Sequence, residues 1–234
     1  MIASREEAPN GCGRESGGCA GARGVRRGAA LLDDTLGLPP EARGVVLFAH
    51  GSGSGRHSLR NRHVARVLQE AGLAALLINL LTPEEEAVDA RTRELRFDIG
   101  LLAGRLTSAA DWLGSQPATR RLQVGYFGAS TGAGAALVAA AERPEAVGAV
   151  VSRGGRPDLA GDALARVGAP TLLIVGGNDV PVIGLNEEAL AQLHGATRLG
   201  IGPGATHLFE EPGALDVVAG LARDWFARYL APNP

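Results

Sequence analysis

Short apolar runs alternate with stretches of helical periodicity along most of this chain. The runs at 43–50 and 73–81 are almost continuously apolar, which is typical of strands buried on both faces. Between them, Val64, Val67 and Leu68 recur at the spacing of one helix face. The same alternation continues to the C-terminus, with further strands expected at 122–127, 146–152, 171–177 and 197–203, and helices at 58–71, 97–116, 133–142, 159–167, 187–194 and 212–229.

This alternation predicts a single α/β domain with a doubly wound, mostly parallel central sheet. Residues 25–38 predict a short antiparallel hairpin before the sheet, with Asp33 and Asp34 at or near its turn. Residues 82–90 predict an acidic surface loop. Residues 1–23 lack periodicity and predict a disordered tail, so the folded domain is expected at 24–234.

Composition narrows the function classes. A chain of 234 residues buries a substantial core, and a net charge of −2 gives no indication of a nucleic-acid binder. No apolar run reaches the roughly 18–20 residues of a membrane span. The first residues lack the apolar core of a signal peptide, so a cytoplasmic location is expected. Cys12 and Cys19 have no histidine or cysteine cluster nearby, so neither a metal site nor a cofactor is predicted.

The segment GASTG at 128–132 is the first candidate for chemistry, because it joins a predicted strand to a predicted helix. A serine at the tip of such a turn is typical of the nucleophile elbow of serine hydrolases. The turn brings Gly128 and Gly132 against neighbouring backbone, where a Cβ would clash. It also places Ser130 at a helix N-terminus, which favours a developing anion. In a chain with 34 glycines the motif alone is weak, so it needs partners elsewhere.

Two such partners follow Ser130 along the chain. Asp179 ends the apolar run TLLIVGG, and His207 follows the last predicted strand. Both fall at strand carboxyl ends, where ligand sites of parallel sheets lie. A base activates the serine hydroxyl, and a carboxylate orients the imidazole and stabilises its protonated form. Asp158 and Asp162 are alternative acids, although they lie on the helical excursion after the preceding strand.

The glycine-rich segment HGSGSG at 50–55 follows the first central strand. Its flexibility allows a backbone N–H to approach a carbonyl oxygen closely. We therefore predict an oxyanion hole from the backbone N–H groups of Thr131 and Ser52. A flexible loop or a phosphate cradle is the alternative, but the segment lacks the Lys-Ser/Thr pair of a P-loop.

Access to this site is expected to be open. The segment 152–170 is too short for a helical cap, which favours small or medium soluble esters as substrates. Arg56 and Arg153 follow the glycine-rich segment and a strand end, where an arginine can bind a substrate carboxylate. The alternative is that these arginines pair with nearby aspartates and organise loops.

The motifs HGSGSG, GYFGASTG, LLIVGGND and GATHLF, in this order, resemble those of the α/β-hydrolase superfamily. More narrowly, they are similar to the lidless branch around dienelactone hydrolase, and the resemblance covers about residues 25–230. It implies Ser130, Asp179 and His207 as the catalytic triad. Dienelactone hydrolases proper have a cysteine nucleophile, whereas this chain has Ser130, which favours a carboxylesterase-like activity.

Other activities remain open at this point. Lactone hydrolase, thioesterase, amidase and acyltransferase chemistry all use the same machinery. A dinucleotide-binding turn is a poor match, because position 137 is leucine where the third glycine of that motif belongs. A non-catalytic binding module with a hydrolase-like fold is the alternative from a different class. The expected partner is a small-molecule ester, with no nucleic acid or membrane, and the sequence leaves the oligomeric state open.

Overall fold

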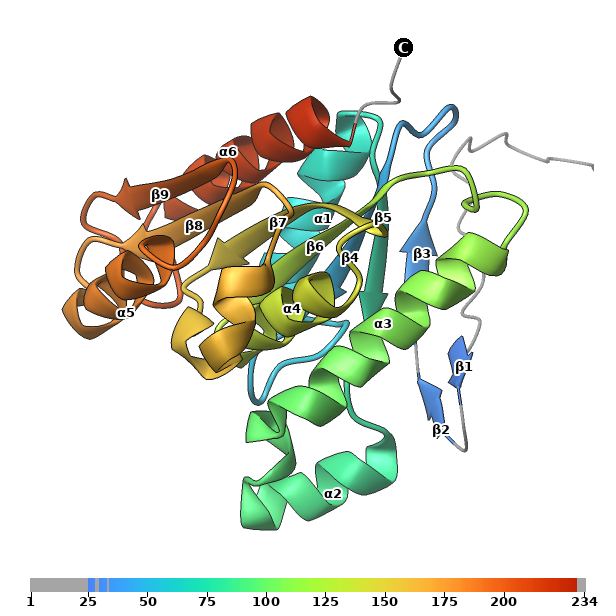
Figure 1. The fold of residues 1–234 in the computed structure, drawn as a ribbon, viewed down its shortest axis with the longest axis horizontal. Helices are drawn as coiled ribbons and strands as arrows, with labels where there is room; N and C mark the ends of the chain where they lie inside the picture. Colours follow the sequence, from blue (N-terminus) through green and yellow to red (C-terminus); the bar gives the residue numbers. More distant parts are fainter. Residues whose placement is uncertain (1–24, 28–29, 33, 231–234) are drawn as a thin grey trace, which may run out of the picture.

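A computed structural model describes residues 25–27, 30–32 and 34–230, with side chains from residue 34 onward. Its centre is a twisted sheet between two layers of helices (Figure 1). The strands of this sheet are β3 (Asp34–Gly37), β4 (Val45–Ala49), β5 (Ala74–Ile78), β6 (Val124–Ala129), β7 (Val147–Arg153), β8 (Thr171–Gly176) and β9 (Thr197–Gly202).

The order of these strands is β3-β5-β4-β6-β7-β8-β9. β3 pairs antiparallel with β5, and all the other pairs are parallel. The prediction of a doubly wound, mostly parallel sheet is therefore confirmed. Because β4, β6, β7 and β8 run in one direction, their carboxyl ends share one edge of the sheet, and the candidate residues follow these ends.

Helices cover both faces of the sheet (Figure 1). On one face, α1 (Leu59–Glu70) and α6 (Ala214–Tyr229) enclose an apolar cluster that includes Phe48 and Phe127. On the other face, a second cluster includes Tyr126 of β6. This second face is covered by α3 (Ile99–Ser115), α4 (Thr131–Glu142), α5 (Val180–Leu190) and the 3₁₀ segment η2 (Pro157–Arg166).

The N-terminal segment differs from its prediction. β1 (Val25–Arg27) and β2 (Ala30–Leu32) form an antiparallel pair, so a hairpin is present. Asp34, however, lies in β3, where it pairs in register with Ile78 of β5. The chain therefore remains extended at Asp34 and adds a strand to the main sheet. Asp33 and the predicted tail lie outside the described residues.

The predicted acidic loop at 82–90 was wrong, because this segment forms the helix α2 (Pro83–Thr92). Thr82 Oγ1 accepts a hydrogen bond from the Glu85 N–H at 3.3 Å, and Glu85 Oε2 accepts one from the Thr82 N–H at 2.8 Å. This reciprocal pair is a capping box, and Pro83 occupies the first turn. The sequence TPEE at 82–85 contains the threonine, proline and glutamate of this helix start.

Two further segments begin or fold differently from their predictions. α5 begins at Val180, directly after Asp179, instead of at residue 187. The expected helix at 159–167 is the 3₁₀ segment η2, which is interrupted at Gly161 (φ 49°). Since β7 and β8 are joined only through η2, no cap domain is present in the described part of the chain.

Candidate active site

The turn at Ser130 has the strained geometry of a nucleophile elbow. Ser130 has φ 50° and ψ −123°, directly between β6 and α4. A Cβ on Gly128 would lie 2.4 Å from Ala133 Cα, and one on Gly132 would lie 2.3 Å from the carbonyl oxygen of Ala49. Only glycine fits such approaches, because Cβ contacts under 3 Å force the backbone apart. The surrounding structure thus holds Ser130 in a conformation that is unfavourable for an ordinary residue.

The structure brings Asp179 and His207 together. Nδ1 of His207, in the loop after β9, lies 2.6 Å from Oδ2 of Asp179, at the end of β8. The Asp179 side chain caps no backbone N–H of α5, so it remains available to the imidazole. Asp158, one of the alternative acids, instead pairs with Arg156 at 2.6 Å.

The end of β7 contacts both His207 and the elbow. The Ser130 N–H donates to the carbonyl of Arg153 at 3.3 Å, and Gly154 follows Arg153. Gly154 packs against the imidazole, since a Cβ there would lie 3.5 Å from Nδ1 of His207. Among the described residues, no hydrogen bond joins the Ser130 hydroxyl to His207. Catalytic hydrogen bonds are often long without substrate and tighten when it binds.

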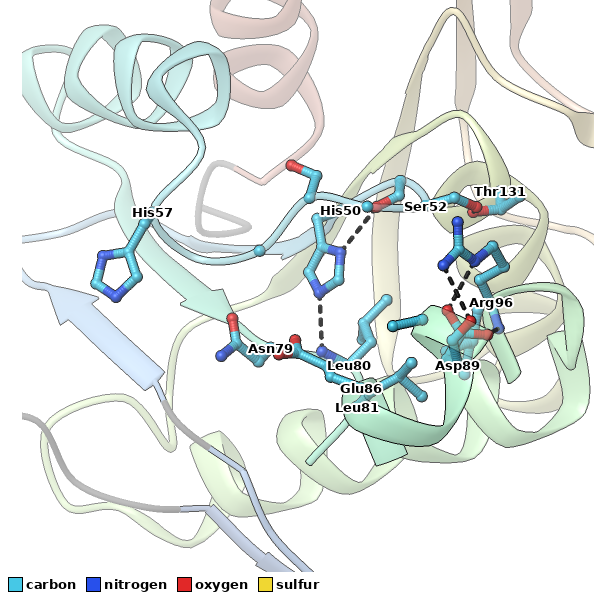
Figure 2. Close-up of a pocket in the computed structure, with 16 residues that line it drawn as sticks. His50, Ser52, His57, Asn79, Leu80, Leu81, Glu86, Asp89, Arg96 and Thr131 are labelled. Atoms are coloured by element: carbon cyan, nitrogen blue, oxygen red, sulfur yellow. Dashed lines mark hydrogen bonds and ion pairs between the residues drawn. The ribbon is translucent and has the colours of Figure 1, made fainter. Parts of the chain in front are cut away.

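The two expected oxyanion donors, Ser52 and Thr131, belong to two segments that are in contact. Oγ of Ser52 is 3.1 Å from Oγ1 of Thr131, which ties the glycine-rich segment to the start of α4 (Figure 2). In the described part of the chain, neither backbone N–H of these two residues has a hydrogen-bond partner. Both donors are therefore free to bind an oxygen.

His50 holds the glycine-rich segment in place, a role that the sequence analysis missed. Its Nε2 accepts a hydrogen bond from the Leu80 N–H at 2.9 Å, and its Nδ1 lies 3.0 Å from the Gly51 carbonyl (Figure 2). These partners require the neutral tautomer with the proton on Nδ1. Burial lowers the pKa of His50, which also favours this neutral form.

A cavity of about 410 Å³ opens beside Thr131 (Figure 2). The glycine-rich segment forms one wall of this cavity, and α2 forms another. Asp89 of α2 is bound by Arg96, with its Oδ2 at 2.7 Å from the guanidinium Nε. This ion pair fixes the α2 wall. The lining comprises residues 50–55, His57, Asn79, Leu80, Leu81, Glu86, Asp89, Ala90, Arg96, Leu102 and Thr131.

The predicted arginines differ in their surroundings. The backbone N–H of Arg56 donates to Asn79 Oδ1 at 2.9 Å, which holds the glycine-rich segment against the end of β5. Arg156, which lies three residues after Arg153, forms a two-pronged ion pair with Asp158 and is thereby neutralised. Arg153 is only 8% exposed, and its Nε and Nη1 have no hydrogen-bond partner among the described residues.

The described residues contain neither a metal-binding cluster nor a membrane-spanning helix. No group of three or more histidine, cysteine, aspartate or glutamate side chains there is arranged to hold a metal ion. None of the described helices has the length and apolar character to cross a bilayer.

Known proteins resemble this chain in both sequence and structure. A crystal structure of dienelactone hydrolase from Anabaena variabilis is 67% identical, with a TM-score of 0.88 over 89% of this chain and 97% of that chain. Carboxyl esterase 2 of Tuber melanosporum is 16% identical, with a TM-score of 0.69 over 92% of this chain and 89% of that chain. This second likeness is one of fold.

Among curated proteins, a putative phosphoribosyl transferase of Mycobacterium tuberculosis is 62% identical over 200 residues, or 85% of this chain. This chain spans 44% of that relative's length. The family model named "Dienelactone hydrolase family" matches residues 32–230, which includes the elbow, Asp179 and His207. The chain therefore belongs to the dienelactone hydrolase family and has the α/β-hydrolase fold.

Proposed function

We propose that this protein is a serine hydrolase that cleaves carboxylic esters of short to medium acyl chain through an acyl-enzyme intermediate. One observation carries the proposal: a hydrogen-bonded Asp179–His207 pair lies beside a serine that a strained turn presents at a helix N-terminus. These are the three groups that nucleophilic catalysis by serine needs.

In the proposed mechanism, Nε2 of His207 takes the proton of the Ser130 hydroxyl as its oxygen attacks the ester carbonyl. Asp179 accepts the hydrogen bond from Nδ1–H, which sets the tautomer and stabilises the imidazolium. The carbonyl oxygen becomes an oxyanion and receives hydrogen bonds from the N–H groups of Thr131 and Ser52. His207 then protonates the departing alcohol, and a water molecule activated by the same imidazole hydrolyses the acyl-enzyme.

The cavity beside Thr131 supports the restriction on acyl length. A volume of about 410 Å³ lies at the small end of the range for ligand sites, about 300–1,000 Å³. Glu86, Asp89 and Ala90 of α2 form part of its wall. We propose that the acyl chain enters this cavity, with its carbonyl at the oxyanion donors.

The M. tuberculosis relative is named for a different chemistry, transfer of a phosphoribosyl group. This chain covers less than half of that protein, and the candidate site described above is that of a hydrolase. We therefore do not extend the transferase activity to this chain. Lactones and thioesters remain in the panel below, since the same triad cleaves them.

A fluorophosphonate probe tests the proposal most directly, because it reacts only with an activated serine. We expect stoichiometric labelling of the wild-type protein and none of Ser130→Ala. Ser115→Ala removes an exposed serine of α3 and is the matched control. A panel of 4-nitrophenyl esters, thioesters and lactones then identifies the preferred bond. Equal labelling of wild type and Ser130→Ala would refute the assignment, and labelling without turnover of any ester would indicate a different bond.

A further inference from the structure

Glu86 of α2 lies on the wall of the cavity beside Thr131. It lies across this cavity from Ser52, one of the two expected oxyanion donors (Figure 2). Its side chain is exposed, and no hydrogen bond or ion pair joins it to another residue in the described part of the chain. The preceding residue, Glu85, is instead held by Arg105 at 2.7 Å. The carboxylate of Glu86 is therefore available to a ligand in the cavity.

The other charges of the cavity lining balance one another. Asp89 accepts two hydrogen bonds from Arg96, one from the backbone N–H at 3.0 Å and one from the guanidinium Nε at 2.7 Å. The remaining titratable side chains of the lining, His50 and His57, are imidazoles and add no negative charge. When both rings are neutral, the lining therefore has one negative charge in excess, that of Glu86.

The cavity also presents apolar surface. Leu80, Leu81 and Leu102 belong to its lining, and all three are buried in the fold. Leucine side chains favour contact with methylene groups, whereas a carboxylate attracts a cation and repels a second carboxylate. The combination matches an aliphatic chain that carries a positive charge at its far end.

We propose that Glu86 makes this cavity selective for acyl chains that end in an ammonium group, so that the preferred esters are those of amino-terminated aliphatic acids. An ammonium group donates hydrogen bonds to the carboxylate and cancels the excess charge of the lining. That the ligand is an acyl chain attacked by Ser130 rests on the proposed function, whereas the binding of an aliphatic ammonium ion in the cavity does not.

A pair of amides tests binding apart from catalysis. 6-Aminohexanamide and heptanamide have the same length and differ only in a terminal ammonium or methyl group. We titrate both into Ser130→Ala by calorimetry in mildly alkaline buffer, where an imidazole is neutral and an aliphatic amine is still charged. Adding Glu86→Gln should weaken 6-aminohexanamide relative to heptanamide by about 5–30-fold, between the values for an exposed ion pair and a charged hydrogen bond. No measurable binding of 6-aminohexanamide would overturn the proposal.

The matched control is Glu84→Gln. It removes the same charge from the same helix, at an exposed position outside the cavity lining. The relative affinity for the two amides should therefore stay at its value in Ser130→Ala. An equal change in Glu84→Gln and Glu86→Gln would assign the effect to the general field of α2 and contradict a specific site at Glu86.

Kinetics then connect Glu86 to the reaction. The 4-nitrophenyl esters of 6-aminohexanoic and heptanoic acid share a leaving group, and their difference in intrinsic reactivity cancels when two proteins are compared. We expect Glu86→Gln to lower the ratio of kcat/KM for the amino ester to that for the heptanoate by about 5–30-fold, and Glu84→Gln to keep the wild-type ratio.

The two proposals fail in different ways. An unchanged ratio in Glu86→Gln, with ester hydrolysis intact, would overturn the selectivity while leaving the esterase assignment in place. Binding of 6-aminohexanamide that depends on Glu86, in a protein that cleaves no ester, would support the ammonium site and contradict the proposed function alone.

Discussion

At the scale of single residues, the candidate site contains residues whose conformations or contacts reduce local stability. Ser130 stays at positive φ because neighbouring backbone encloses both elbow glycines. Asp179 begins α5 without capping it, since its carboxylate is bound to His207 instead. Such local costs are common at functional sites, where the surrounding fold compensates for them. Substitutions here should therefore change activity far more than stability.

Replacing the nucleophile should abolish turnover in a folded protein. We expect Ser130→Ala to lose about 10⁶-fold in kcat for 4-nitrophenyl butyrate, the loss typical for a triad serine. Steady-state kinetics and circular dichroism would measure activity and folding together. More than a tenth of wild-type activity in this variant would mean that another residue performs the attack.

The acid of the triad can be identified by paired substitutions. Asp179→Asn should lower kcat by about 10⁴-fold, because an amide holds the imidazole in the wrong tautomer. Asp158→Asn, which removes only the partner of Arg156, should lower it by no more than a few-fold, as expected for an ion pair near the surface. The opposite ranking of the two kcat values would show that the proposed triad is incorrect.

Because the imidazole of His50 is buried, we expect the folded protein to lose stability in mild acid. Burial lowers the pKa of its imidazole, so the unfolded chain takes up a proton at a higher pH than the folded protein does. Its contribution is complete above the unfolded value of 6.5 and is lost as the pH falls below it. Urea midpoints should therefore decrease from about pH 7 towards about pH 5.

The control for this effect compares two histidines. His50→Asn should be less stable at neutral pH and should lose less further stability in acid than wild type. His194→Asn, at an exposed position, should follow the wild-type curve. Parallel curves for wild type and His50→Asn would assign the acid sensitivity to another group.

At the scale of elements, α2 is the part of the fold that shapes the cavity. It is anchored at both ends, by the ion pair of Glu85 with Arg105 at 2.7 Å and by that of Asp89 with Arg96 at 2.7 Å. Glu86 and Asp89 of α2 lie across the cavity from Ser52 of the glycine-rich segment (Figure 2). Its position should therefore limit which acyl chains fit.

Releasing α2 should broaden the acyl preference. We expect Asp89→Asn to reduce the ratio of kcat/KM for 4-nitrophenyl butyrate to that for the octanoate by several-fold, since one CH₂ is worth about 0.8 kcal/mol when buried. Glu84→Gln, on the exposed side of α2, should leave the ratio unchanged. An unaltered ratio in Asp89→Asn would exclude α2 from substrate selection.

At the scale of the whole molecule, the doubly wound sheet gathers residues from distant parts of the chain at one edge. Ser130, Asp179 and His207 follow three different strands, and each lies near that edge because parallel strands end there together. No cap domain covers this edge in the described structure, and the cavity beside Thr131 is the space that we propose for the acyl chain. The size of the cavity should therefore set the upper limit on substrate length.

This limit predicts a maximum in the activity profile. We expect kcat/KM to peak at acyl chains of about two to six carbons and to level off or fall beyond them, because further CH₂ groups find no buried surface. Esters of increasing length with a common 4-nitrophenyl leaving group measure the profile. A continued rise to about twelve carbons would reveal a longer apolar channel.

Much of this organisation follows from the hydrophobic pattern. The central strands were predicted because they are buried on both faces, and the elbow because a tight turn demands glycine at both sides. The α2 helix was missed because its apolar periodicity is weak, although its capping box can be recognised in the sequence. The isolation of Arg153 could not be predicted, since pairing depends on neighbours such as Asp158 and Arg60 that only the folded chain brings near.

The positive φ of Ser130 also limits which residues can replace it during the evolution of this protein. Serine codons lie one base from those of cysteine and of threonine. The two replacements differ, however, in how well their side chains tolerate this backbone conformation. Cysteine has an unbranched Cβ and can occupy the left-handed region as serine does, whereas the second γ-substituent of threonine makes that region a severe outlier. The elbow therefore permits an exchange between serine and cysteine at position 130, and it disfavours threonine there.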